Sequence, residues 1–187
     1  MTAKTVFRTL WGWIGIAASP RGVCAIVLPK PSRRAAERAL CVQDVSSNGH
    51  RALPNRLLRD AQAQVTAYLV GKRRTLDFPI DLSTGTSFQR RVWQTALRIP
   101  YGRARSYQWI ASKVGGKRYA RAVGNALGAN PVPLIVPCHR VLAANGKTGG
   151  FSAPGGVDTK LKMLSIERAQ PGGQTLFDDL PLARRPA

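Results

Sequence analysis

The chain has 187 residues, of which 29 are Lys or Arg and only 9 are Asp or Glu, so its formal net charge is +20. A hydrophobic fraction of 44% is ordinary for a globular protein and argues against disorder throughout the chain. The length suits one domain or two small ones. The charge does not determine a fold, but it makes a polyanion, such as nucleic acid or an anionic membrane surface, the first partner to consider.

Acidic residues are absent from a long central stretch. No Asp or Glu stands between Asp81 and Asp158, a run of 76 residues that carries 11 of the basic ones. A solvated surface in a generally basic protein would give the same pattern, but we favour a face that binds a polyanion.

The cysteines are few and odd in number: Cys24, Cys41 and Cys138. We therefore expect a reducing compartment and no disulfide framework. The chain has no C-x-x-C or H-x-x-x-H spacing, so we expect no metal site. The apolar run Leu10–Ala18 loosely imitates a signal peptide, but turn residues interrupt and follow it, and it is far shorter than the ~20 residues of a membrane span.

The N-terminal half predicts an α/β domain over residues 1–82, with a small antiparallel sheet. The expected elements are paired strands over Val6–Ala18 and Val23–Leu28, a loop over Pro29–Arg38, a third strand over Leu40–Val45, a helix over Leu57–Val70 and an edge strand over Asp77–Leu82. The segment Asp81–Gly85 is the expected boundary with a second domain over residues 83–169.

The second half is predicted to be mainly helical. The expected helices are Ser87–Leu97 with Ser87 as its N-cap, Tyr107–Val114 capped by Ser106, Arg118–Leu127, and Asp158–Glu167. The second and third are joined by a Gly-containing turn, as in a helix-turn-helix. Residues 170–187 are rich in Gly and Pro and are expected to be a loosely ordered tail.

The second helix of that pair has an unusual run of small side chains, at Ala120, Ala122, Gly124, Ala126 and Gly128. Small residues allow a backbone to approach a partner closely, or two helices to pack tightly, and the sequence leaves both interpretations open. A long Arg121 in this setting could reach into a groove.

Cys138 is a candidate nucleophile. Three prolines within seven residues make a rigid approach to it, and His139 and Arg140 follow it directly. An unperturbed cysteine has a pKa of about 8.5, so a neighbouring His or Arg would raise its reactive thiolate fraction. A buried structural cysteine is the alternative interpretation.

The string Ile-Val-Pro-Cys-His-Arg-Val around Cys138 resembles the active-site motif of the O6-alkylguanine-DNA alkyltransferases, also called methylated-DNA–protein-cysteine methyltransferases. Other motifs follow in that family's order and spacing: Ser87-Phe88-Gln89-Arg90-Arg91-Val92-Trp93, Ile99-Pro100-Tyr101-Gly102, Ser106-Tyr107, Ala120-Arg121-Ala122-Val123-Gly124 and Asn130-Pro131. The resemblance covers about residues 5–168 and is most specific over residues 87–167.

The resemblance implies a ribonuclease H-like N-terminal domain followed by a winged helix-turn-helix domain. It implies DNA repair by direct, irreversible transfer of the alkyl group from O6-alkylguanine in double-stranded DNA to Cys138, with O4-alkylthymine as a further candidate lesion. Minor-groove binding and base flipping would precede the transfer. No cofactor, metal or membrane is implied. The expected protein is a monomer that can cluster on DNA, in the cytoplasm of a bacterium or the nucleus of a eukaryote.

The resemblance also assigns roles to residues. Cys138 would attack the alkyl carbon, His139 would activate it through a bridging water, and Glu167 would hold the other imidazole nitrogen. Tyr107 would donate a proton to the departing guanine, and Asn130 would tie the turn before the active-site strand to the helix-turn-helix.

Further residues would line the pocket or contact DNA. The implied pocket residues are Val141, Phe151, Ser152 and Pro133, and the implied DNA-binding residues are Arg121, Ala120, Ala122, Gly124, Gln108 and Gln89. Arg121 would fill the gap that the flipped base leaves. The chain departs from the family at Phe151, where many relatives have Tyr, and at an apparent Ala153-Pro154 insertion. Cys24, Cys41 and His50 do not match the zinc ligands of some relatives.

Two other functions are considered. A module that binds alkylated DNA without chemistry would not need the Cys138, His139 and Glu167 that this chain retains. A cysteine hydrolase would turn over repeatedly, whereas the alkyltransferase would stop after one event per molecule.

Overall fold

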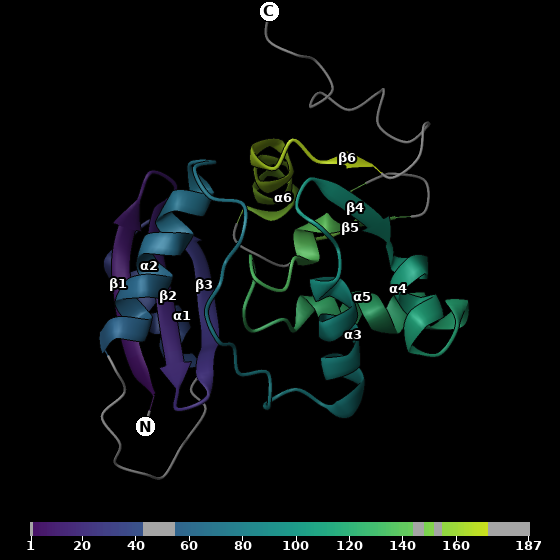
Figure 1. Cartoon of the computed structure of the whole chain (residues 1–187), viewed down its shortest axis with the longest axis horizontal. Helices are drawn as coiled ribbons and strands as arrows, with labels where there is room; N and C mark the ends of the chain where they lie inside the picture. The colour runs from purple at the N-terminus through teal and green to yellow at the C-terminus, as the bar shows by residue number, and fades with distance from the viewer. Residues whose placement is uncertain (1, 43–54, 144–147, 152–154, 172–187) are drawn as a thin grey trace, which may run out of the picture. The chain divides into compact units, whose positions relative to one another are not determined.

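The computed structural model describes residues 2–42, 55–143, 148–151 and 155–171 (Figure 1). The chain divides into two compact units, one of Met1–Gly85 with Pro131–Ile135 and the other of Thr86–Asn130 with Val136–Ala187. The sequence analysis placed residues 131–135 in the second domain. They belong to the first unit because the Pro131 carbonyl accepts a hydrogen bond from the Ile26 amide at 2.8 Å.

Three antiparallel strands in the order β1-β2-β3 form the sheet of the first unit: β1 (Ala3–Thr9), β2 (Gly12–Ser19) and β3 (Gly22–Lys30). The prediction of one strand over Val6–Ala18 was wrong, because a tight turn at Leu10 and Trp11 folds that run back on itself. The turn is held by the Thr9 hydroxyl, which donates to the Gly12 carbonyl at 2.9 Å. Gly12 has a positive φ of 122°.

Two helices cover the sheet, α1 (Arg33–Val42) and α2 (Asn55–Leu69). The predicted α2 is confirmed, but the loop over Pro29–Arg38 was wrong, because most of it belongs to α1. The predicted strand over Leu40–Val45 was wrong over residues 40–42, which are helical, and its remainder lies outside the described residues. Ala36 and Leu40 lie one turn apart on the buried face of α1 and pack against Gly15 of β2. Ile14 and Ile16, which point to the other face of β2, are also fully buried, so both faces of the sheet are covered.

The predicted edge strand over Asp77–Leu82 is reduced to a single parallel bridge between Ile80 and Val23. Prolines lack the amide that a longer ladder needs, and Pro79 stands in this segment. The segment is fixed by side chains instead, since Ser19 donates to the Asp81 carboxylate at 2.6 Å and Arg21 pairs with it at 3.2 Å.

The second unit packs α3 (Ser87–Leu97), α4 (Tyr107–Val114) and α5 (Ala120–Gly128) against one another. A one-turn 3₁₀ helix, η1 (Lys117–Tyr119), precedes α5. The indole of Trp93 crosses this core and donates to the Ala126 carbonyl at 2.8 Å. The N-cap of α3 is Thr86, not the predicted Ser87, because the Thr86 hydroxyl accepts from the Gln89 amide at 3.2 Å.

A small parallel sheet completes the second unit. Its central strand β4 (Arg103–Ser106) pairs with β5 (Val141–Leu142) and β6 (Gln170–Pro171), and the helix α6 (Gly156–Ile166) lies between the last two in sequence. The predicted tail therefore starts two residues too early, and its remainder lies outside the described residues. None of the described helices is long and apolar enough to cross a membrane.

Candidate active site

Cys138 begins a one-turn 3₁₀ helix, η2 (Cys138–Arg140), that leads into β5. The expected active-site strand therefore starts only after the cysteine. The turn is closed by the Arg140 amide, which donates to the Pro137 carbonyl at 2.9 Å. All three residues of η2 are buried.

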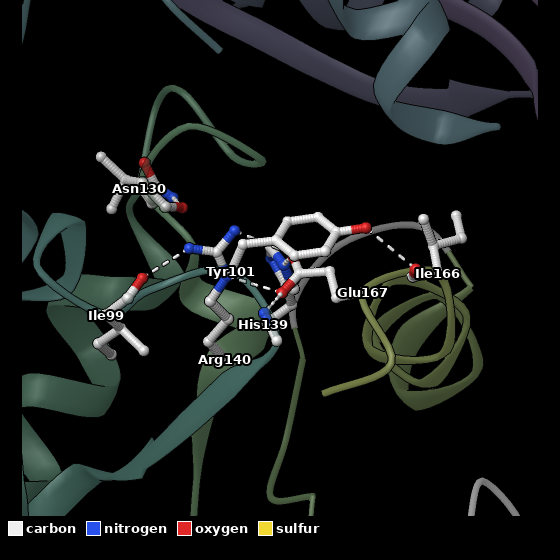
Figure 2. A network of polar contacts seen from close by, with 9 residues as sticks. Ile99, Tyr101, Asn130, His139, Arg140, Ile166 and Glu167 are labelled. Carbon is white, nitrogen blue, oxygen red and sulfur yellow. Dashed lines mark hydrogen bonds and ion pairs between the residues drawn. The ribbon is translucent and has the colours of Figure 1, made fainter. Parts of the chain in front are cut away.

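His139 and Glu167 form a fully buried pair. The distance between Nε2 of His139 and Oε1 of Glu167 is 2.6 Å, and both side chains have no exposed surface (Figure 2). Glu167 is the C-cap of α6, so the end of that helix carries the carboxylate to η2. The structure thus brings together two of the residues that the family resemblance named, His139 and Glu167.

Arg140 binds the Glu167 carboxylate as well. Its Nε donates to Oε2 of Glu167 at 2.8 Å and its Nη2 donates to Oε1 at 3.0 Å, while Nη1 donates to the Ile99 carbonyl at 2.6 Å (Figure 2). The sequence analysis considered Arg140 only as a neighbour that could raise the thiolate fraction of Cys138, and it missed this contact with Glu167. One available signal was the scarcity of acids nearby, since Asp158 and Glu167 are the only ones between residues 82 and 177.

The Glu167 carboxylate remains ionised over the whole physiological range. Burial by itself opposes the charge, but hydrogen bonds from His139 and Arg140, together with the positive charge of Arg140, outweigh it and lower the pKa of Glu167 to about 2. The Gly102 amide adds a further donor, 3.2 Å from Oε2.

The His139 imidazole is neutral near pH 7. Burial lowers the pKa of His139, and the positive charges of Arg140 and Lys160 lower it further, against the raising effect of Glu167. Because Nε2 lies against the carboxylate, a neutral ring carries its hydrogen on Nε2, and Nδ1 is the basic nitrogen.

Burial raises the pKa of the Cys138 thiol, so the resting sulfur favours its protonated form. Several groups oppose this effect and favour the thiolate, namely the Asn130 side chain, the positive charge of Lys160 and the backbone amides of η2. Asn130 also donates to the Val136 carbonyl at 2.9 Å, which ties the approach to Cys138 to the end of α5.

Tyr107 is the first residue of α4, directly after the Ser106 cap. Its ring lies beside Gly149, where a Cβ would approach to 3.2 Å, and beside Gly124 of α5, where a Cβ would lie 3.8 Å away. Burial, and secondarily the charge of a Cys138 thiolate, raises the pKa of Tyr107. The phenol therefore holds a proton that it can donate.

A buried lysine lies in the same region and was also missed by the sequence analysis. Lys160 of α6 has no exposed surface and donates to the carbonyls of Val141, at 2.7 Å, and Thr148. Its Nζ lies 5.9 Å from the ring centroids of both Tyr107 and Phe151. Burial lowers the pKa of Lys160 to about 8.

The remaining predicted pocket residues are only partly brought together. Val141 is buried in β5, and Phe151 is half-buried near Lys160. Ser152 and the Ala153-Pro154 insertion lie outside the described residues. Pro133 is half-buried in the segment that belongs to the first unit.

The predicted DNA-binding residues differ in exposure. Arg121 and Gln108 are exposed, whereas Ala120, Ala122 and Gly124 are half-buried. Gln89 has a local role, because its side-chain oxygen accepts from the Thr86 amide at 2.8 Å and completes the capping box of α3.

The other cysteines and the second histidine lie apart from this site. Cys24 is buried in the core of the first unit, Cys41 is exposed on α1, and His50 lies outside the described residues. Among the residues that the structure describes, no cluster of three or more His, Cys, Asp or Glu could hold a metal ion.

Comparisons with known proteins show which family this chain resembles. Residues 87–169 match the family model of the 6-O-methylguanine DNA methyltransferase DNA-binding domain. The methylated-DNA–protein-cysteine methyltransferase of Mycobacterium tuberculosis (strain ATCC 25618 / H37Rv) is 47% identical over 116 residues, which cover 62% of this chain and 68% of the relative.

This chain belongs to the methylated-DNA–protein-cysteine methyltransferase family.

Other members support the assignment. The constitutive methylated-DNA–protein-cysteine methyltransferase of Bacillus subtilis (strain 168) is 41% identical over 128 residues, covering 67% of this chain and 74% of the relative. A crystal structure of Mycobacterium tuberculosis OGT in complex with DNA is 34% identical, with a TM-score of 0.68, and the match covers 88% of this chain and 92% of that one.

Proposed function

We propose that this protein repairs DNA by transferring the alkyl group of O6-alkylguanine to Cys138. The observation that carries the proposal is the buried contact between His139 and Glu167 beside the cysteine, at 2.6 Å. It supplies a base and a group that orients the base, which a cysteine nucleophile requires. Family membership supports the same reaction.

The reaction begins with removal of the thiol proton. Nδ1 of His139 takes this proton through a bridging water, and Glu167 stabilises the imidazolium that forms. The Cys138 sulfur then attacks the alkyl carbon, the S–C bond forms and the C–O6 bond breaks. The sulfur becomes a neutral thioether, which is a poor leaving group, so the protein acts once.

Tyr107 assists the departure of guanine. Its phenol holds a proton near pH 7, and donating this proton to the guanine ring neutralises the negative charge that develops as the C–O6 bond breaks. Val141 and Phe151, both of the second unit, line the pocket in this proposal.

Double-stranded DNA is the partner, and the helix pair α4 and α5 is its binding element. We infer a winged helix-turn-helix that inserts α5 in the minor groove, with the exposed Arg121 replacing the flipped base in the stack. The first unit would have a ribonuclease H-like fold. The protein would bind as a monomer that can cluster along DNA.

Intact mass spectrometry tests the transfer. After incubation with a duplex that carries one O6-methylguanine, we expect the protein to gain about 14 Da, one methylene, with one event per molecule. Cys138→Ala should gain nothing. Cys41→Ala, which removes an exposed cysteine, should react like the parent protein. Absence of the added mass in the parent, or its persistence in Cys138→Ala, would refute the proposal.

A further inference from the structure

We propose that Arg140 is a positioning residue for alkyl transfer, which fixes the Glu167 carboxylate against His139 and keeps the imidazole a neutral base. This inference rests on the proposed function, because it concerns the base that activates Cys138. It adds a residue to the Cys138, His139 and Glu167 constellation and gives that residue a role that can be measured.

The Arg140 guanidinium binds both oxygens of Glu167 and a backbone carbonyl at the same time. Two parallel hydrogen bonds, at 2.8 and 3.0 Å, join it to both oxygens of Glu167, and a third, at 2.6 Å, joins it to the Ile99 carbonyl. The guanidinium also lies near the ring of Tyr101, with 5.8 Å between Cζ and the ring centroid. Ile99 directly follows Arg98, the C-cap of α3, so this third bond joins the guanidinium to the segment that ends that helix.

The carboxylate cannot turn while these contacts hold. Four donors surround its two oxygens: Nε and Nη2 of Arg140, Nε2 of His139 and the Gly102 amide. A bidentate guanidinium fixes the plane of the carboxylate as well as its position. The plane of Glu167 in turn determines which way the imidazole faces.

The charge of Arg140 has a separate effect. A lone carboxylate 2.6 Å from a buried imidazole favours the imidazolium, which has no free electron pair with which to accept the cysteine proton. The positive guanidinium opposes that preference and lowers the pKa of His139. Burial acts in the same direction and is the larger cause.

Other charged groups around His139 are few among the described residues. From α6 and its C-cap, Lys160 and Glu167 act on its pKa, and Cys138 and Arg140 flank it on η2. The strand β4 also packs against η2, but Arg103 is exposed and Arg105 lies over the Trp109 ring. Of these cations, Arg140 is the one that donates hydrogen bonds to Glu167, the hydrogen-bond partner of His139.

Histidine titration by NMR tests the inference directly. The chain has only two histidines, so a His50→Gln background leaves the His139 signals alone in the spectrum. In that background we compare Arg140→Gln, which removes the charge but keeps a donor, with Arg140→Lys, which keeps the charge but loses the bidentate geometry. Arg34→Met removes an exposed arginine of α1 as the control.

We expect Arg140→Gln to raise the pKa of His139 by roughly one unit, whereas Arg140→Lys and Arg34→Met leave it close to that of the parent. The acid limb of the rate of Cys138 alkylation by free O6-benzylguanine should move to higher pH by the same amount in Arg140→Gln. In Arg140→Lys the rate should fall roughly tenfold without a shift of that limb, because the carboxylate is free to turn.

Equal His139 pKa values in the Gln and Lys variants would overturn the electrostatic role. An unchanged alkylation rate in Arg140→Lys would overturn the positioning role. This measurement does not use Arg140→Gln, so it still decides the positioning role if that variant does not fold. The titration uses the protein without substrate. Failure of the parent to accept an alkyl group would therefore count against the proposed function alone, while the His139 pKa still decides the effect of Arg140.

Discussion

At the scale of single residues, the site is organised around one carboxylate. Glu167 accepts hydrogen bonds from His139, Arg140 and Gly102, which lie 27 to 65 residues away in the sequence. The pKa of Glu167 and that of His139 are both lowered, so the carboxylate is charged and the imidazole neutral near pH 7. That pair of states is the one a base and its orienting group need before reaction.

Glu167→Gln should slow alkyl transfer at least about tenfold, because the amide no longer stabilises the imidazolium that forms on His139. Binding to undamaged duplex should change little, since the side chain is fully buried. Single-turnover alkylation and a DNA-binding titration check the two expectations. Asp158→Asn, on the exposed face of the same helix, is the control. An unchanged rate of transfer would contradict the role of Glu167.

At the scale of elements, short-range contacts fix where the helices of the second unit begin. The α3 capping box is reciprocal, because the Thr86 hydroxyl accepts from the Gln89 amide while the Gln89 side chain accepts from the Thr86 amide. It places the N-cap at Thr86, one residue before the serine that the sequence analysis chose, and the helix begins at Ser87. Gln89 is thereby held at the beginning of α3.

Thr86→Ala should lower the free energy of unfolding by about 1 kcal/mol, because it leaves an amide of the first turn without its cap. Ser87→Ala, which alters the residue first predicted as the cap, should have a clearly smaller effect. Urea denaturation followed by circular dichroism measures both. A larger loss in Ser87→Ala than in Thr86→Ala would show that the cap is assigned to the wrong residue.

The sequence left open whether the small residues of α5 allow a partner to approach closely or allow two helices to pack tightly. Gly124 lies against the Tyr107 ring of α4, so at this position the small side chain serves helix packing. Val123, Ala126 and Leu127 are buried in the core, whereas Arg121 is exposed. The exposed face of α5 therefore carries the arginine, and the packed face positions the tyrosine.

At the scale of the whole molecule, the acidic residues that offset the basic ones are unevenly distributed along the chain, whose net charge is +20. The acid-free stretch between Asp81 and Asp158 contains α3, α4, α5 and Cys138, so the chemistry and the proposed DNA contacts share one basic segment. The first unit is basic as well, and long-range attraction toward DNA is the role that its charge would serve.

Arg121→Ala should weaken repair of duplex DNA far more than the reaction with free O6-benzylguanine, because only the duplex reaction requires a base to be flipped and replaced in the stack. Rates of Cys138 alkylation on the two substrates give the comparison. Arg34→Ala, on the first unit, controls for the loss of one positive charge. Equal losses on both substrates would contradict the proposed insertion of Arg121.

Local patterns in the sequence were enough for several features. Helical spacing predicted α2, the serine before Tyr107 predicted the start of α4, and the motif around Cys138 indicated the family, whose resemblance in turn implied a role for Glu167 beside His139. These features depend on neighbouring residues or on a motif of fixed spacing, so one sequence contains them. The same reasoning missed the turn after Thr9 and the helix α1, where short apolar runs fit strand and helix alike.

The folded chain alone revealed the contacts between distant segments. The fold buries Arg140 and Lys160, so that Arg140 binds Glu167 and Lys160 donates to the Val141 and Thr148 carbonyls. The sequence indicated neither contact. Residues 131–135 likewise joined the first unit through a hydrogen bond to Ile26. A buried charge must find a partner wherever the fold provides one, and the distance along the chain does not restrict that choice.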